Sequence, residues 1–298
     1  RRVDEASPMV DARLPSGERV NVVLPPLTIN GPTLTIRRFP RPYPMEELVR
    51  RGSVSQSAGE LLAALVRARL NIVVSGGTGS GKTTMLNALS AFISGHERVI
   101  TIEDAAELQL QQAHVISLES RPANVEGVGA ISIRDLVRNA LRMRPDRIIV
   151  GEVRGGETLD MLQAMNTGHE GSLVTVHANS AHEAITRLET LATMSELQIP
   201  YEAIRDQINS AIDVVVQLQR GVDGGRRVVQ IDVVASQHRE EFRLENVLNF
   251  RIDQNDAVHG VQGEWLTAPL PAHLVQRIKD AGQELPPDFV GGRAEAWQ

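Results

Sequence analysis

A glycine-rich pattern that binds phosphates, G-x-x-x-x-G-K-[ST], is matched in full by Gly76–Thr83. In such a loop, glycines let successive backbone N–H groups curl around a β-phosphate, and the following helix adds the positive end of its dipole. In this pattern Lys82 would bridge the β- and γ-phosphates, and the Thr83 hydroxyl can coordinate Mg²⁺. A dinucleotide site is excluded, because Lys82 stands where the G-x-G-x-x-G pattern needs its last glycine. The pattern predicts a nucleoside triphosphate site formed by Gly76, Gly77, Thr78, Gly79, Ser80, Gly81, Lys82, Thr83 and Thr84.

Carboxylates follow two apolar segments that are typical of buried strands. A phosphate loop needs one carboxylate for the metal and one for the attacking water. Glu152 follows one of these strands, where such folds place a carboxylate that holds Mg²⁺ directly or through water. Glu103 and Asp104 follow the other strand, and Glu107 comes one helical turn later. The alternative interpretation is that these acids only cap helices.

The spacing of the histidines and the small number of lysines exclude two other classes of site, a catalytic zinc site and a guanine-binding site. His169-Glu170 is not followed by a second histidine at the H-E-x-x-H spacing, so we expect no catalytic zinc. His177 ends an apolar strand at the same edge as the acids, although a single histidine there, like His169, is more often structural. Lys82 and Lys279 are the only lysines in the sequence, so no N-K-x-D segment that reads guanine is present. A signalling GTPase is therefore excluded.

Length and composition are those of a globular protein with about two domains. The sequence has 298 residues, 42% of them hydrophobic and 23% charged, and a net charge of −6. The acidic balance argues against direct nucleic-acid binding. The sequence contains no Cys, which excludes disulfides and thiolate zinc sites. It also shows no apolar run of about 18 residues, so we expect no transmembrane segment. Because the sequence starts at Arg1 and not at Met, we expect further chain before it.

Two domains are predicted from a change of pattern near residue 55. Short alternating strands are expected at 9–12, 19–24 and 34–39, followed by a helix over 45–51. The small polar residues at 52–57 are the candidate hinge. This division gives an N-terminal domain over residues 1–55 and a C-terminal domain over residues 56–298.

After residue 61 the pattern alternates between strands and helices, which predicts an α/β fold with a mainly parallel sheet. Such sheets bind their ligands at the carboxyl ends of the strands. Ser180 with Glu183 forms a capping box for one of the helices. We expect helices at 61–69, 82–93, 132–144, 157–166, 181 onward, 201–211 and 273–281, and strands at 71–75, 98–102, 115–118, 147–150, 173–176, 213–219 and 228–234.

Three further segments resemble motifs of the secretion and pilus-assembly ATPases. Thr101–Glu107 resembles their Asp box, Arg144–Arg154 resembles their Walker B segment, in which Gly-Glu replaces the common Asp, and Thr167–Asn179 resembles their His box. With the phosphate loop, the four motifs stand in the family's order. The stretch Arg134–Leu191 is most similar to the tight-adherence (Flp-type) pilus ATPases, and the type IV secretion relatives come next. The absence of Cys departs from type II ATPases, which usually carry a four-cysteine zinc module.

This resemblance implies a RecA-like P-loop ATPase domain hinged to a smaller N-terminal α/β domain. It implies ATP and Mg²⁺ as ligands, and a homo-hexamer at the cytoplasmic face of an inner-membrane platform protein. Glu103 would activate the attacking water, Glu152 would act through Mg²⁺, Lys82 would hold phosphates, and His177 would sense the nucleotide. The candidates for phosphate contact or sensing are Arg37, Arg38, Arg134, Arg142, Arg144 and Arg154.

The leading hypothesis is an ATP-hydrolysing motor that assembles, or also retracts, a tight-adherence pilus. The alternatives are a type IV secretion ATPase and a scaffold whose ATP occupancy, without turnover, controls partner docking. A DNA-translocating relative would need a basic stripe that the net charge of −6 disfavours.

Overall fold

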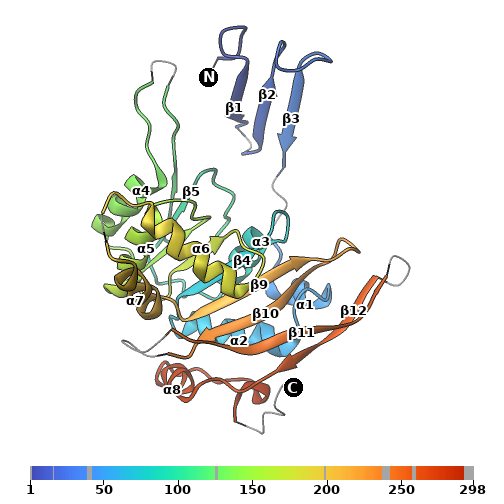
Figure 1. Ribbon diagram of the computed structural model, residues 1–298, viewed down its shortest axis with the longest axis vertical. Coiled ribbons are helices and arrows are strands. Elements are labelled where there is room, and N and C mark those ends of the chain that lie inside the picture. The colour runs from blue at the N-terminus through green and yellow to red at the C-terminus, as the bar shows by residue number, and fades with distance from the viewer. Residues whose placement is uncertain are drawn as a thin grey trace. The chain divides into compact units, whose positions relative to one another are not determined.

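The chain forms two compact units, Arg1–Pro42 and Tyr43–Gln298 (Figure 1). The computed structural model describes residues 2–15, 17–38, 42–124, 127–197, 199–236, 242–256 and 260–291. In the first unit, β1 (Met9–Arg13), β2 (Arg19–Val23) and β3 (Thr33–Arg37) form an antiparallel sheet in that order. The three strands lie where the alternating pattern predicts them, and Phe39, the expected end of the third, lies outside the described residues.

The division between the units falls earlier in the chain than the expected boundary at residue 55. Helix α1 (Met45–Arg50) packs in the core of the second unit beside α2 (Gln56–Arg67). Ser55 caps α2 by accepting a hydrogen bond from the Ala58 N–H at 3.1 Å, and Val54 is buried. The candidate hinge at 52–57 therefore lies inside the second unit, because its residues are fixed by capping and burial.

The second unit is built on a sheet with the strand order β12-β11-β10-β9-β4-β8-β7-β5-β6 among the described residues. The strands from β9 to β6 are parallel, and β10, β11 and β12 add to them in antiparallel fashion. The strand bounds are β4 Ile72–Gly76, β5 Val99–Glu103, β6 Val115–Glu119, β7 Arg147–Val150, β8 Leu173–Val176, β9 Val214–Arg220, β10 Arg226–Val234, β11 Leu244–Asp256 and β12 Gly260–Thr267.

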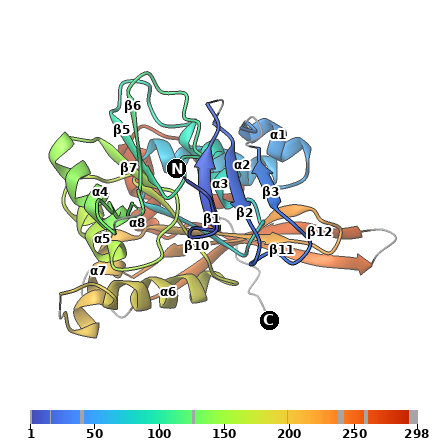
Figure 2. The same ribbon diagram turned by 90° about the horizontal axis from the view of Figure 1, so that it is seen from above.

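Helices cover both faces of this sheet, which confirms the predicted α/β fold. Within β4, Ile72 and Val74 belong to one hydrophobic core and Val73 to the other, as expected when side chains alternate across a strand buried on both faces. Figure 2 shows the sheet nearly edge-on, with α6 on the side opposite α1 and α2. One core includes α1, α2, α3 (Lys82–Ser90), α8 (Ala272–Asp280) and η2 (Pro287–Phe289); the other includes α4 (Ile133–Ala140), η1 (Leu141–Met143), α5 (Glu157–Asn166), α6 (Ala181–Thr193) and α7 (Tyr201–Ala211).

Helix capping agrees with the sequence pattern in part. Ser180 caps α6 by accepting from the Glu183 N–H at 3.1 Å, but the Glu183 carboxylate accepts from the Asn179 N–H instead of returning to Ser180. The reciprocal capping box forms at α4, between Ser132 and Asp135. In the parts of the chain described above, we find no helix with the length and apolar character needed to cross a bilayer.

Candidate functional site

The carboxyl ends of the parallel strands lie at one edge of the sheet and carry the acids and the glycine-rich loop. The register pairs Ser75 of β4 with Val176 of β8, and Ile102 of β5 with Val150 of β7. In the sheet, β8 and β7 lie between β4 and β5. Because neighbouring strands are about 4.8 Å apart, the ends of β4 and β5 are separated by roughly 14 Å. The loop and the acids therefore face a common space at this edge.

Three glycines of the loop are required by its backbone or its packing. Gly79 and Gly81 have φ angles of 70° and 100°, in the left-handed region that favours glycine, and Gly81 is the N-cap of α3. A Cβ on Gly76 would lie 2.4 Å from the Ser80 Oγ and 2.7 Å from the Leu218 carbonyl oxygen. The loop therefore follows a close path from β4 into the start of α3, beside β9.

Lys82 begins α3 and its side chain folds back over the loop. The Nζ atom donates hydrogen bonds to the carbonyl oxygens of Gly76 at 2.8 Å and Gly77 at 3.1 Å. Burial lowers the pKa of Lys82, the negative charge of Glu152 acts against this shift, and the positive charge of Arg154 adds to it. The ammonium of the loop and the carboxylate beyond β7 thus lie within electrostatic reach of each other.

Glu103 is the last residue of β5 and is 4% exposed. Its Oε1 atom accepts hydrogen bonds from the backbone N–H groups of Glu107 at 2.9 Å and Leu108 at 3.1 Å. Burial raises the pKa of Glu103 to about 7, although these two N–H donors oppose the rise. A carboxyl group with this pKa can accept and release a proton near neutral pH. Glu107, also singled out by the sequence, contributes its backbone to this arrangement.

Gly151, between β7 and Glu152, leaves the space that the Glu103 side chain fills. A Cβ at position 151 would lie 2.8 Å from Glu103 Cγ and 3.4 Å from its Oε1. The Gly151 carbonyl oxygen accepts a hydrogen bond from the Thr175 hydroxyl of β8 at 2.6 Å, which fixes the backbone here. The glycine of the Gly-Glu pair is therefore required by the buried carboxyl group on the neighbouring strand.

One arginine joins two of the predicted acids. The Glu152 Oε2 accepts hydrogen bonds from the Arg154 Nε at 3.0 Å and Nη2 at 2.5 Å. The same guanidinium donates through Nη1 to Asp104 Oδ2 at 3.0 Å. Arg154 is exposed and bound to carboxylates of two strand ends, so its guanidinium lies at the edge that also holds the loop.

His177 and the two threonines lie at the same edge. His177 follows β8 directly and is exposed; because Val176 pairs with Ser75, the histidine is level with the first glycine of the loop. Thr83 and Thr84 are half-buried in the first turn of α3. The structure thus brings Lys82, Thr83, Glu103, Glu152 and His177 to one edge of the second unit.

The other candidate arginines lie elsewhere. Arg134 of α4 is bound by Asp160 at 2.8 Å and by Glu196 at 3.4 Å. Arg142 and Arg144 lie in and after η1, which precedes the amino end of β7 and is therefore away from the loop of the same chain. In the first unit, Arg37 ends β3 and Arg38 follows it, both exposed. Contact between these two arginines and phosphates stays a prediction.

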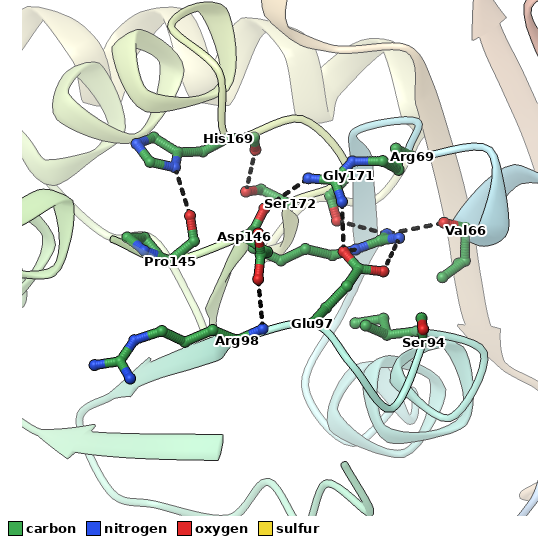
Figure 3. Close-up of polar contacts among 12 residues, drawn as sticks. Val66, Arg69, Ser94, Glu97, Arg98, Pro145, Asp146, His169, Gly171 and Ser172 are labelled. Carbon is green, nitrogen blue, oxygen red and sulfur yellow. Dashed lines mark hydrogen bonds and ion pairs between the residues drawn. The ribbon is translucent and has the colours of Figure 1, made fainter. Parts of the chain in front are cut away.

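Some residues of the segments that resemble the Walker B and His-box motifs lie at the opposite edge of the sheet, where the parallel strands begin. Arg147 is 1% exposed and donates through Nε and Nη2 to both carboxylate oxygens of Glu97, at 2.7 and 2.9 Å. Its Nη1 donates to the carbonyl oxygens of Val66 at 2.8 Å and Gly171 at 3.2 Å. Figure 3 shows this network, in which the ring of His169 lies near the Pro145 carbonyl oxygen at 3.1 Å. These residues hold strands and helices together and do not reach the loop.

Two residues in contact with the loop are not among those singled out by the sequence. Arg226 of β10 donates through Nε to the Gly79 carbonyl oxygen at 2.8 Å, and Arg220 at the end of β9 lies close to the same glycine. The Gly-Gly turn between these strands is a sequence signal for a hairpin. That signal predicts that the two arginines face each other across the hairpin, but their place beside the loop depends on the pairing of β9 with β4 in the sheet.

Taken together, this edge holds a phosphate cradle, a lysine, oxygen donors and a carboxyl group with a pKa near 7. The Thr83 hydroxyl and the Glu152 carboxylate are the hard oxygen ligands that Mg²⁺ prefers, and Mg²⁺ commonly takes further ligands from substrate phosphates. Such a set of groups fits the transfer of a phosphoryl group to water.

Comparison with known proteins is consistent with this chemistry. Residues 1–249 match the family described as type II/IV secretion system protein. A protein of Mycobacterium tuberculosis named for conjugal transfer is 41% identical over 261 residues, which are 85% of this chain and 73% of that protein. The type IV secretion system protein PtlH of Bordetella pertussis is 42% identical over 258 residues, which are 75% of this chain and 74% of that protein.

Solved structures share the fold. The VirB11 ATPase of the Brucella suis type IV secretion system, in complex with sulphate, superimposes with a TM-score of 0.52 and 32% identity over 78% of each chain. The pilus retraction motor PilT with bound ADP superimposes with a TM-score of 0.56 and 23% identity, covering 84% of this chain and 64% of that one. At that identity the second likeness shows the fold alone.

Proposed function

The chain is an ATPase that belongs to the type II/IV secretion system protein family, and we propose that it works as a Mg²⁺-dependent, hexameric motor that powers a membrane-associated pilus or secretion machine. The observation that carries this proposal is the buried Glu103 carboxyl group, with a pKa near 7, at the edge shared with Lys82 and Glu152. A binding protein that does not turn over ATP has no need of a proton acceptor held in this way.

In the proposed reaction, Lys82 turns from the loop carbonyls to the β- and γ-phosphates, and Glu103 accepts the proton of the water that attacks the γ-phosphorus. The bond between the γ-phosphorus and the bridging oxygen breaks, which releases ADP and phosphate. Thr83 and Glu152 would hold Mg²⁺, which neutralises phosphate charge when bound. Arg154 keeps Glu152 and Asp104 in place at the strand ends. We expect His177, which is level with Gly76, to sense the nucleotide.

The function is tested by measuring ATP hydrolysis and particle mass on the same preparation. We expect Mg²⁺-dependent turnover of ATP and a hexamer by light scattering in the presence of Mg·ATP. Lys82→Ala should reduce turnover by at least about 10²-fold, because the lysine contacts the transferred phosphoryl group. A wild-type chain that folds, stays monomeric with Mg·ATP and shows no turnover above Lys82→Ala would contradict the proposal.

Gly151→Ala should lower kcat by about 10²-fold with little change in ATP affinity. The added Cβ would lie 2.8 Å from Glu103 Cγ, and the Glu103 side chain is buried and held by two backbone N–H groups, so it must move out of position. A displacement of about 1 Å can cost this much in rate. Steady-state kinetics and equilibrium binding separate the two effects. Gly95→Ala is the matched control, since a Cβ there meets no atom within 4 Å; equal kinetics for both variants would contradict this account.

Two machines are candidates for the motor. The likeness of Arg134–Leu191 to tight-adherence pilus ATPases supports pilus assembly at an inner-membrane platform. The 42% identity to PtlH and the match to a conjugal transfer protein favour a type IV secretion machine as the second candidate. The two candidates are distinguished by complementing a deletion strain with this chain and measuring which is restored, surface pili or substrate transfer.

A further inference from the structure

The turn between β9 and β10 is held rigidly beside the phosphate loop. Across the turn, the Gly221 N–H donates to the Gly225 carbonyl oxygen at 2.8 Å. Asp223 accepts from the Gly225 N–H at 2.9 Å and from Arg227 Nη2 at 2.7 Å. The hydrogen bond from Arg227 holds the pKa of Asp223 well below its usual range, so this carboxylate is ionised and bound within the turn. The two residues at its ends, Arg220 and Arg226, are therefore well fixed at the backbone.

Arg220 and Arg226 are directly opposite each other across the hairpin, although both carry positive charge. Like charges in this position destabilise a pair of strands. In the described part of the chain neither arginine forms an ion pair with a carboxylate, whereas their neighbour Arg227 is bound to Asp223. Two opposed cations without an acidic partner indicate a role that the fold itself does not require.

Both side chains lie against the loop. Arg226 donates through Nε to the Gly79 carbonyl oxygen at 2.8 Å, which fixes the plane of its guanidinium group. A Cβ on Gly81 would lie 3.3 Å from Arg226 Cδ, and a Cβ on Gly79 would lie 3.9 Å from Arg220 Nη1. The arginines therefore border the phosphate cradle itself.

The sheet order tells which end of a nucleotide these arginines would meet. Counting from β4, the acids lie toward β8, β7 and β5, and the arginines lie on the other side, on β9 and β10. The γ-phosphate must face Glu103 and Glu152, since they serve the attacking water and the metal. An extended nucleotide held in the loop then directs its nucleoside end toward the hairpin between β9 and β10.

We infer that Arg220 and Arg226 bind the nucleoside end of ATP, with the Arg226 guanidinium stacked on the purine base. This inference rests on the proposed ATPase function and adds the groups that recognise the nucleoside. A planar guanidinium stacks on aromatic faces, which the ammonium of lysine cannot do. The hydrogen bond to Gly79 holds that plane ready before ATP arrives, which reduces the entropy cost of binding.

The test compares Mg·ATP with Mg·tripolyphosphate, which has phosphates but no base or ribose, by titration calorimetry. Arg226→Ala should weaken ATP binding about tenfold, the size expected of a desolvated cation–π contact, and should leave tripolyphosphate binding unchanged. Arg226→Lys should not restore ATP binding, because the lysine ammonium carries the charge but has no planar group that could stack on the base. Arg187→Ala, an exposed arginine of α6, is the control and should change neither affinity.

Equal weakening for both ligands, or full rescue by Arg226→Lys, would show a phosphate contact and overturn the inference. Unchanged ATP affinity in Arg226→Ala would overturn it as well. Failure of the wild-type chain to bind either ligand would instead count against the proposed function. Far-UV circular dichroism of each variant shows that the fold is kept.

Discussion

Glu103→Gln should bind Mg·ATP with wild-type affinity and hydrolyse it at least about 10²-fold more slowly, because loss of a general base typically costs 10²–10⁴ in rate. The amide is nearly isosteric with the carboxyl group and can keep the hydrogen bond from the Leu108 N–H. It cannot accept a proton from water. Single-turnover kinetics on pre-bound ATP measure the chemical step directly.

The pH dependence of kcat distinguishes a proton acceptor from a structural carboxyl group. Burial raises the pKa of Glu103 to about 7, so the reactive, ionised form becomes the minor form below that pH. We expect kcat of the wild type to fall about tenfold per pH unit below 7 and to level off above it. In Glu103→Gln the residual rate should lose this dependence.

Glu107→Gln is the control, because it keeps the backbone N–H that donates to Glu103 and removes only a charge that is a minor cause of the raised pKa of Glu103. Its rate should stay within a few-fold of wild type. A Glu103→Gln chain with near-normal turnover would show that another group takes the proton. Normal surface pili or transfer in cells that carry an inactive Glu103→Gln chain would favour the nucleotide-gated scaffold over the motor.

The fold of the second unit and the placement of its site follow from local patterns. Apolar runs such as Ile148–Val150 can only be buried on both faces, so alternation with helices determines a parallel sheet. In such a sheet all carboxyl ends share one edge, and residues as distant in sequence as Lys82, Glu103 and Glu152 are then expected together. The structure confirms the α/β fold and brings these residues to one edge; their catalytic roles stay predictions.

The features that sequence patterns did not predict depend on tertiary packing. The β11–β12 hairpin departs from simple alternation, since its register shifts between Ile252 and Gln254. The polar segment at 52–57 suggests a hinge, yet packing of α1 on α2 places it inside the second unit. The strand expected at 147–150 places Arg147 at its start, but no sequence pattern indicates that Arg147 pairs with Glu97 there. Arg147 and Glu152 are near neighbours in sequence but lie at opposite edges, separated by the length of β7, roughly 13 Å.

Substitution of the buried Arg147 should have the second large effect, in this case on the stability of the fold. Arg147→Ala should lower the free energy of unfolding by about 3–5 kcal/mol, the usual cost of breaking a buried ion pair from one side. The substitution leaves Glu97 with Arg69 as its remaining cation, at 2.6 Å, and removes the donor to two buried carbonyl oxygens. Urea unfolding, followed by circular dichroism, measures the change.

Two further variants separate the ion pair from simple packing. Arg147→Met fills most of the volume without charge or donors, so it should be nearly as destabilising as Arg147→Ala; recovery of wild-type stability by Met would refute a role for the ion pair. Arg251→Ala removes an arginine whose pair with Glu264 is exposed on β11 and β12, and it should change stability by less than about 1 kcal/mol.

The pH dependence of stability gives an independent test of the same pair. Burial acts to raise the pKa of Glu97, but the hydrogen bond and charge of Arg147, with the charge of Arg69, outweigh it and hold the pKa below its ordinary value of 4.5. A carboxyl group whose pKa is lowered in the folded state stabilises the protein above the unfolded pKa, and this contribution is lost as the pH falls through the folded value. Wild-type stability should therefore decline below about pH 4.5 more steeply than that of Arg147→Met, in which burial of Glu97 is opposed only by the charge of Arg69 and a backbone hydrogen bond from Ser94. Parallel stability curves for the two proteins would mean that Glu97 gains its low pKa from other neighbours.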